Sequence, residues 1–344
     1  MRLAPYQGKK WFRFQPARSR KVGQISTGVN NAKNSLPAVS DIGNAWCFVV
    51  DKPLGYPMFI RLLAALLFLS IGQNVSAQVV EEQFNLPVSI RHASAGEVRQ
   101  EVVVTVFRDS RRPRSPYLVL GHGRAGKPEE RVALGRARYT ANSQYFVSLG
   151  FAVFVPTRIG YGVTGGPDLE DTGPCNIKNY PPGYDAAAQL TTQVIAHARR
   201  LPYVDAGRGL VVGQSFGGAT AITMATRPTE GLVATVNFAG GGGGNPTARP
   251  GQPCRPDMLR AMFADYGRSA RIPTLWLYSE NDRYFGSSQP RAWFDAFVAA
   301  GGRAKFIQLP ANGDDGHSSF TRNPTAWRPH LEAFLQEVGF RNNR

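Results

Sequence analysis

The chain has 344 residues, of which 42% are hydrophobic and 19% are charged. This balance is typical of a globular protein and excludes a chain that is disordered throughout. The net charge of +16 would suit a nucleic-acid binder, but the arginines are scattered and form no stripe with interleaved aromatic residues, so we expect no nucleic-acid partner.

The first 77 residues differ in composition from the rest of the chain. They carry half of the net charge, with 10 Lys and Arg against 2 Asp and Glu. Residues 1–57 show no hydrophobic periodicity and are rich in Lys, Arg, Asn, Ser and Gly. We interpret them as a non-native extension produced by an over-extended gene start, with translation beginning at Met58, or as a disordered basic extension.

Residues 58–77 have the pattern of a secretory signal peptide. Arg61 precedes an apolar run, Leu62–Ile71, and a small-x-small site ends at Ala77. The run is short for a membrane span. We therefore predict export to the periplasm or the medium, cleavage after Ala77 and no membrane span in the mature chain. The alternative is a basic extension followed by a membrane anchor.

Two cysteines, Cys175 and Cys254, lie in residues 78–344, and Cys47 lies upstream. An exported chain would meet an oxidising compartment, where two cysteines can remain bridged. We predict a Cys175–Cys254 disulfide; the alternative is two separate buried thiols. The chain has no Cys/His cluster with zinc spacing, so we expect no metal.

From residue 78 onward, two alternating apolar stretches, 83–90 and 98–107, predict an antiparallel pair of strands. Apolar runs typical of buried strands then alternate with segments whose hydrophobic residues recur with the period of a helix. The predicted strands are 117–120, 151–155, 209–213, 233–238, 274–278 and 305–309, and the predicted helices are 132–149, 184–200, 219–225, 256–266, 289–300 and 325–337. This alternation predicts an α/β fold with a mostly parallel central sheet and helices on both faces. No linker or repeat divides residues 78–344, which we interpret as a single domain.

Two irregular segments, 159–183 and 240–254, each follow a strand at the end where open α/β sheets bind ligands. The second contains five glycines, Gly240–Gly244. It lacks the Lys-Ser/Thr of a P-loop and the spaced glycines of a dinucleotide fold. Flexibility or a close approach of the backbone explains the run better, and we expect no cofactor.

The segment Gly213-Gln214-Ser215-Phe216-Gly217 joins a predicted strand to a predicted helix. A nucleophile elbow needs this context, because small flanking residues let the strand and helix approach while the serine projects above the sheet. The sequence therefore predicts Ser215 as a nucleophile.

Serine requires an imidazole base. Two histidines follow Ser215 in the chain. His317 lies in a loop after the last predicted strand, whereas His330 lies in the terminal helix. We assign His317 as the base and expect His330 to be a surface or capping residue.

A carboxylate must hold the base in its working tautomer. Asp282 follows the strand 274–278, at the sheet edge expected for Ser215, and is our candidate. Glu280 is a competitor that we expect to be solvated. Asp314 and Asp315 stand in a glycine-rich turn, where carboxylates commonly form turns.

Attack on a carbonyl builds an oxyanion, which needs two N–H donors. We predict the backbone N–H of Phe216 as one donor. The loop Gly121–Arg124 follows a predicted strand, and by position the N–H of Arg124 is the second. We expect His122, in the same loop, to be structural.

These residues resemble the α/β-hydrolase superfamily, and within it the dienelactone hydrolase-like group and its prolyl-oligopeptidase-related relatives. The resemblance spans residues 115–338 and rests on His122-Gly123, residues 158–162, the elbow at Ser215, Glu280-Asn281-Asp282 and Gly316-His317. It implies that Tyr161 and His122 border the pocket, or that Tyr161 adds an oxyanion donor, against a packing role. Ser215 stands where dienelactone hydrolases have cysteine, so their narrow substrate does not carry over. The propeller domain of the oligopeptidases is missing from this sequence.

The sequence thus predicts an exported serine hydrolase that cleaves small-molecule carboxylic esters through an acyl-enzyme on Ser215. An amidase or peptidase-like acyl hydrolase would use the same residues. A binding protein that keeps the fold without turnover is the alternative from another class.

Overall fold

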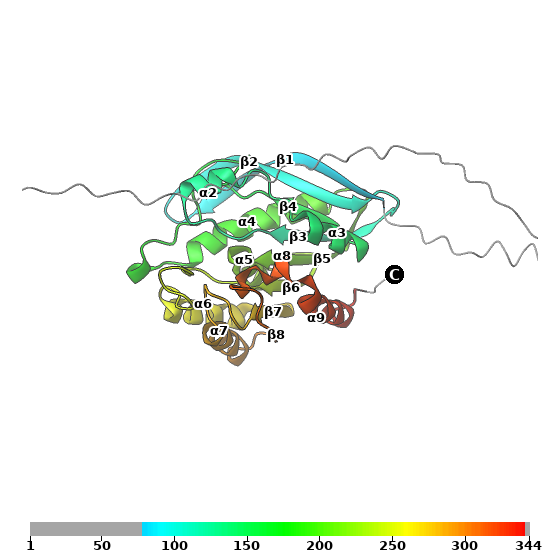
Figure 1. Ribbon diagram of the computed structural model, residues 1–344. Helices are drawn as coiled ribbons and strands as arrows, with labels where there is room; N and C mark the ends of the chain where they lie inside the picture. The colour runs from blue at the N-terminus through cyan, green and yellow to red at the C-terminus, as the bar shows by residue number, and fades with distance from the viewer. Residues whose placement is uncertain (1–77, 341–344) are drawn as a thin grey trace, which may run out of the picture. The chain divides into compact units, whose positions relative to one another are not determined.

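Eight strands form one sheet in the order β1-β2-β4-β3-β5-β6-β7-β8 in the computed structural model, which describes residues 78–340 (Figure 1). The strands are β1 (Val79–His92), β2 (Gly96–Asp109), β3 (Ser115–Gly121), β4 (Ala152–Pro156), β5 (Val204–Gln214), β6 (Leu232–Phe238), β7 (Thr274–Ser279) and β8 (Ala304–Leu309). The pairs β1–β2 and β2–β4 are antiparallel and the other neighbours are parallel. The predicted α/β fold with a mostly parallel sheet is confirmed. The predicted extension (1–57) and signal peptide (58–77) lie outside the described residues.

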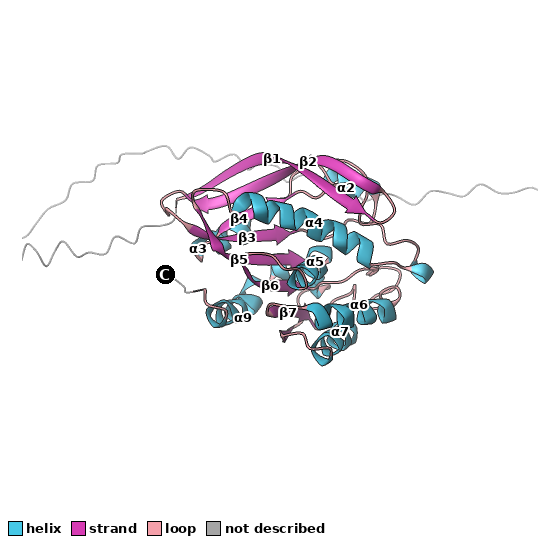
Figure 2. Cartoon of the chain, turned by 180° about the vertical axis from the view of Figure 1, so that it is seen from behind, coloured by secondary structure: helices cyan, strands magenta, loops and turns pink. Residues whose placement is uncertain are grey.

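Helices cover both faces of this sheet (Figures 1 and 2). One face carries α3 (Thr140–Ser148) and α9 (Pro324–Glu337), and the other carries α4 (Pro181–Ala198), α5 (Phe216–Ala225), α6 (Pro256–Ser269) and α7 (Ser288–Ala299). Successive strand residues point to opposite faces. Leu118 therefore joins the core under α3 and α9, whereas Val119 joins the core under α4. Burial on both faces explains why the strands read as continuous apolar runs.

The prediction of one helix over 132–149 is wrong, because this region forms two helices, α2 (Pro128–Ala133) and α3. Between them the backbone turns left-handed at Gly135 (φ 64°) and Tyr139 (φ 47°). The loop after β4 pairs with this segment, since the N–H of Val163 donates to the Gly135 carbonyl at 3.1 Å. Tertiary contacts thus override a helical pattern that continues in the sequence.

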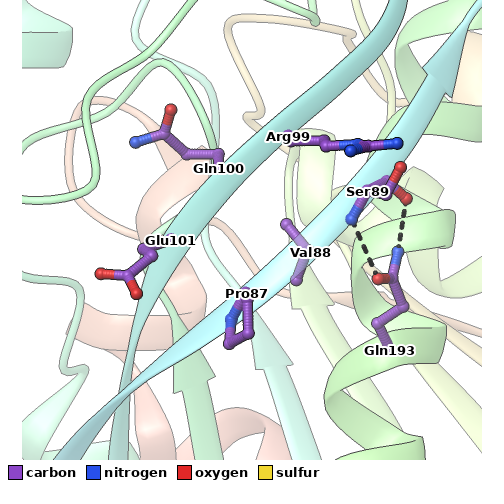
Figure 3. A pocket seen from close by; sticks show the side chains of 7 residues that line it. All are labelled: Pro87, Val88, Ser89, Arg99, Gln100, Glu101 and Gln193. Carbon is purple, nitrogen blue, oxygen red and sulfur yellow. Dashed lines mark hydrogen bonds between the residues drawn. The ribbon is translucent and has the colours of Figure 1, made fainter.

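Side-chain amides from α4 cover the outer edge of β1. Gln193 accepts from the N–H of Ser89 at 3.1 Å and donates to the Ser89 carbonyl at 2.8 Å (Figure 3). Gln189 repeats this pairing with Arg91, at 2.9 Å for both bonds. The amides satisfy groups that would otherwise invite pairing with another chain. The surface cavity between β1 and β2 at this edge contains none of the predicted site residues.

No helix within residues 78–340 is long and apolar enough to cross a membrane.

Candidate active site

Ser215 lies in a tight turn between β5 and α5. Its backbone has φ 55° and ψ −118°, a conformation that is strained for a residue with a Cβ. The flanking glycines leave room for the turn: a Cβ on Gly213 would lie 2.0 Å from the Gly217 carbonyl oxygen, and one on Gly217 would lie 2.4 Å from that of Gly121. Strand, turn and helix are arranged as a nucleophile elbow requires.

His317 and Asp282 lie together at the same edge of the sheet. The Nδ1 of His317 is 2.9 Å from Oδ2 of Asp282, and both residues are buried. The other carboxylate oxygen, Oδ1, accepts the N–H groups of Tyr284 (2.8 Å) and Phe285 (3.1 Å). Asp282 is therefore held in place and directed at the imidazole.

The loop that carries His317 is attached to the elbow. The amide of Gln214, the residue before Ser215, donates from Nε2 to the His317 carbonyl at 3.2 Å. Tyr284 stacks on the imidazole with ring centroids 4.0 Å apart. The first contact joins the histidine loop to the residue before Ser215, although 103 positions separate Gln214 from His317 in the sequence.

The alternative acids and the alternative histidine have other positions. Glu280 and Asp314 are exposed, and His330 is exposed on α9. Asp315 caps the short turn Gly316–Ser318, because its Oδ1 accepts the N–H of His317 at 3.0 Å. Among these carboxylates, Asp282 is the one on the imidazole.

The two predicted oxyanion donors border the elbow. Phe216 is the first residue of α5, so its N–H has no acceptor within the helix. Arg124 follows Gly123, whose added Cβ would lie 3.4 Å from the Cβ of Ser215. Both Phe216 and Arg124 line the cavity into which Ser215 opens.

His122 is buried beneath this loop. Its Nε2 accepts the N–H of Arg158 at 3.1 Å, so Nδ1 carries the proton and donates to the Gly123 carbonyl at 2.7 Å. Burial lowers the pKa of His122 well below its usual value, and the Arg158 guanidinium acts in the same direction. A neutral imidazole with both nitrogens engaged suits the expected structural role.

Tyr161 is fully buried, and its hydroxyl donates to Oε2 of Glu170 at 2.7 Å. Neither Tyr161 nor His122 is among the residues that line the cavity at Ser215. The two rings pack edge to face with centroids 4.7 Å apart. The geometry thus favours the packing role over the pocket role that the resemblance implied for them.

The cavity at Ser215 has a volume of about 570 Å³. Its walls come from the loop after β3, the segment 159–183 and the glycine run. The glycines allow a close approach of the backbone: a Cβ on Gly242 would lie 2.6 Å from the Tyr184 hydroxyl, and one on Gly244 would lie 2.8 Å from the Cβ of Tyr284. Of the two explanations for the glycine run, the tight approach is the one that the packing supports.

A disulfide joins the two irregular segments, since Cys175 is bonded to Cys254 with their Cα atoms 5.0 Å apart. The bond thereby links two of the walls around the cavity. Within residues 78–340, no three His, Cys, Asp or Glu side chains are grouped in a way that could hold a metal ion.

Four residues around the site were assigned no role from the sequence: Gln214, Tyr139, Arg158 and Glu170. Arg158 lies just beyond the end of β4, at the sheet edge where ligands bind. Its position after a predicted strand could have marked it as a candidate in the sequence. The contacts of Tyr139 and Glu170 depend on burial, which a loop sequence does not reveal.

Several solved structures are similar to the chain. A Klebsiella pneumoniae protein assigned to the dienelactone hydrolases has 14% identity and a TM-score of 0.47, with 75% of this chain and 98% of that chain covered. A thermostable esterase from Pseudomonas putida has 17% identity and a TM-score of 0.49, with 84% and 90% covered. An acylaminoacyl peptidase from Pyrococcus horikoshii has 14% identity and a TM-score of 0.49, with 79% and 42% covered. No curated protein matches the sequence.

The family follows from a sequence match. The model of the alpha/beta hydrolase family matches residues 101–336, which is more than half of the chain. The match includes the elbow, the histidine loop and seven of the eight strands in whole or in part. The chain therefore belongs to the α/β-hydrolase family.

Proposed function

We propose that the protein is a serine hydrolase that cleaves carboxylic esters of small molecules. The observation that carries the proposal is the buried His317–Asp282 pair, at 2.9 Å, tied by Gln214 to the strained turn of Ser215. Ser215 opens into a cavity large enough for a small ester.

The reaction begins when Oγ of Ser215 attacks the ester carbonyl carbon and His317 takes the serine proton at Nε2. Asp282 holds the Nδ1–H tautomer that leaves Nε2 available. The carbonyl oxygen becomes an oxyanion, which the N–H groups of Phe216 and Arg124 stabilise. His317 then protonates the leaving alcohol. Water, deprotonated by His317, attacks the acyl-enzyme, releases the acid and restores Ser215.

An amidase uses the same residues and differs in its leaving group. Comparing kcat/KM on ester and amide substrates with the same acyl group distinguishes the two activities. We expect the ester to be preferred, and a preference for the amide would replace the esterase proposal with the amidase.

Export is part of the proposal. It rests on the signal-peptide pattern of residues 58–77 and is supported by the Cys175–Cys254 bond, since disulfides persist in oxidising compartments. Expression of residues 58–344 in a bacterium, followed by mass spectrometry of the periplasmic and secreted fractions, tests it. We expect a mature N-terminus at Gln78, and an unprocessed cytoplasmic protein would contradict export.

Replacement of Ser215 by alanine tests the nucleophile. We expect hydrolysis of short p-nitrophenyl esters and labelling by a fluorophosphonate probe to disappear. Ser318→Ala is the matched control, because this serine adjoins His317 and its hydroxyl donates only to the Asp315 carbonyl among the described residues. Full hydrolysis by Ser215→Ala would refute the esterase mechanism. Absence of labelling in the wild type would favour a binding protein.

A further inference from the structure

A buried ion pair lies directly beneath the loop that carries Gly123 and Arg124. The Arg158 guanidinium pairs with Glu170, and their side chains are only 4% and 3% exposed. The Tyr161 hydroxyl also donates to Glu170, at 2.7 Å. Burial of an ion pair is expensive in free energy and is weak evidence for stability by itself. A role for this ion pair must therefore be sought in the other hydrogen bonds that Arg158 makes.

Arg158 uses its other N–H groups to hold two successive carbonyls of the loop. Nη1 donates to the His122 carbonyl at 2.6 Å, and Nη2 donates to the Gly123 carbonyl at 3.2 Å. Nδ1 of His122 donates to the same Gly123 carbonyl at 2.7 Å. Two donors thus direct the Gly123 carbonyl toward the interior.

The direction of this carbonyl determines the direction of the next N–H. The described chain contains no cis peptide bond, and in a trans peptide the C=O and the following N–H point in opposite directions. The N–H of Arg124 therefore points away from Arg158 and His122. A rotation of this peptide plane by half a turn would present a carbonyl oxygen in its place, which would repel an oxyanion.

The preceding peptide is held in the same way and has a different partner. The N–H of Gly123, opposite the His122 carbonyl, donates to the Tyr139 hydroxyl at 3.4 Å. That hydroxyl donates to Oε1 of Gln214 at 2.9 Å. The Gly123 N–H is thus engaged within the protein, which leaves the Arg124 N–H as the donor of this loop at the cavity.

We propose that Arg158, held by Glu170, is a positioning residue that fixes the Gly123–Arg124 peptide in the orientation in which its N–H stabilises the oxyanion. This inference rests on the proposed function. It assigns the buried ion pair a role in catalysis through the peptide, although neither side chain touches the substrate. His122 shares this role: its Nδ1 donates to the same Gly123 carbonyl, and the peptide requires both donors to keep this orientation.

The first test is Arg158→Lys, which keeps the positive charge but cannot hold two carbonyls and Glu170 in one plane. We expect kcat on a p-nitrophenyl ester to fall toward the loss of about 100-fold that follows removal of one oxyanion donor. KM should change by less than about twofold, because the contribution is made mainly in the transition state.

The matched control is Arg199→Lys. Arg199 also holds a backbone carbonyl, that of Ala206 at 2.9 Å, and pairs with a glutamate, Glu230 at 2.6 Å. It follows α4, before the start of β5, and is not among the residues that line the cavity. We expect Arg199→Lys to keep the wild-type kcat. An equal loss of kcat in both variants would assign Arg158 a structural role and overturn the inference.

A trifluoromethyl ketone inhibitor tests the oxyanion without turnover. Ser215 Oγ bonds to the ketone carbon, the ketone oxygen takes the negative charge and the serine proton passes to His317. We expect the inhibition constant of Arg158→Lys to rise by the same factor by which kcat falls. If the wild type forms no adduct, the proposed function and the inference both fail. If the wild type and the folded variant bind equally tightly, the inference alone fails.

A second pair of variants covers the case in which Arg158→Lys does not fold. His122→Asn places an amide donor near the position of Nδ1, whereas His122→Val removes the donor to the Gly123 carbonyl. We expect inhibitor affinity in the order wild type, His122→Asn, His122→Val, with thermal unfolding measured for each. A folded His122→Val with wild-type affinity would overturn the inference.

Discussion

At the scale of single residues, the position of a carboxylate decides its role. Asp282 faces the imidazole of His317, and Asp315 accepts the backbone N–H of the same histidine. Both are aspartates near His317, yet one is placed to act on the ring and the other on the backbone of a turn.

We predict that Asp282→Asn and Asp315→Asn separate activity from stability. Loss of the carboxylate that holds the base in its tautomer lowers kcat by about 10⁴-fold in the serine protease triad, and we expect a similar loss for Asp282→Asn. Asp315→Asn should keep most of its activity, with a change in stability of at most about 1 kcal/mol, because asparagine also caps helical turns. Ester hydrolysis measures the activity of each variant, and thermal unfolding measures its stability. Equal activity of the two variants would contradict the assignment of Asp282.

Tyr184 and Tyr180 are both buried beside the glycine run, but their hydroxyl groups differ in hydrogen bonding. The Tyr180 hydroxyl donates to the Cys254 carbonyl, whereas no described residue accepts from or donates to the Tyr184 hydroxyl, which lies at the cavity. Burial raises the pKa of Tyr184 well above its usual value, so the phenol stays protonated.

We predict that Tyr180→Phe lowers the free energy of unfolding by about 1–3 kcal/mol, because a buried carbonyl loses its donor. Tyr184→Phe should leave the free energy of unfolding unchanged or raise it, because it removes a buried polar group without a partner. Urea unfolding of both variants measures the difference. A larger loss for Tyr184→Phe would show that its hydroxyl has a structural partner.

At the scale of elements, the disulfide joins two irregular segments that follow different strands. Cys175 and Cys254 are separated by 79 residues in the sequence. Closing a loop of this length in the unfolded chain stabilises the folded state by about 4.5 kcal/mol in the chain-entropy model.

We therefore predict that reduction of the purified protein lowers its free energy of unfolding by about 4.5 kcal/mol. The double variant Cys175→Ser, Cys254→Ser should have the stability of the reduced protein and should not respond to a reductant. Denaturant unfolding with and without dithiothreitol measures both. Equal stability of the oxidised protein and the double variant would contradict the prediction.

At the scale of the whole molecule, the described fold begins with Gln78. Its N–H donates to Oδ1 of Asp109 at 3.2 Å, and its carbonyl accepts the N–H of Ser110 at 3.1 Å. Val79 then opens the ladder of β1 with β2. The contacts that start the sheet are therefore contained in residues 78–344.

We predict that a chain of residues 78–344 folds with the same unfolding temperature and specific activity as the chain that begins at Met58. The reason is that the strand pairs of β1 and the buried clusters are formed between residues of 78–340. Calorimetry and ester hydrolysis on both chains check this. An unfolding temperature several degrees lower for the shorter chain would contradict it.

The strands and most helices were predictable because their information is local. Buried strands form apolar runs in the sequence, and helices show their own hydrophobic period. All eight strands were therefore recognised, although β5 begins at Val204, before the predicted start at residue 209. The helix over 132–149 failed because Tyr139 turns left-handed, where its hydroxyl bonds Gln214, 75 residues away. No pattern around Tyr139 contains that contact.

The same distinction between local and long-range information applies to the residues of the site. The chain alone indicated Ser215, His317 and Asp282, because an elbow motif and loops at strand ends are legible in the sequence, and it indicated the α/β fold that places them at one edge. Only the tertiary structure decided how the Gly123 carbonyl is held, since Arg158 reaches it from 35 residues away and meets Glu170 a further 12 residues on. Whether a guanidinium is buried, and which carbonyls it holds, depends on the packing of distant segments rather than on neighbours in the sequence.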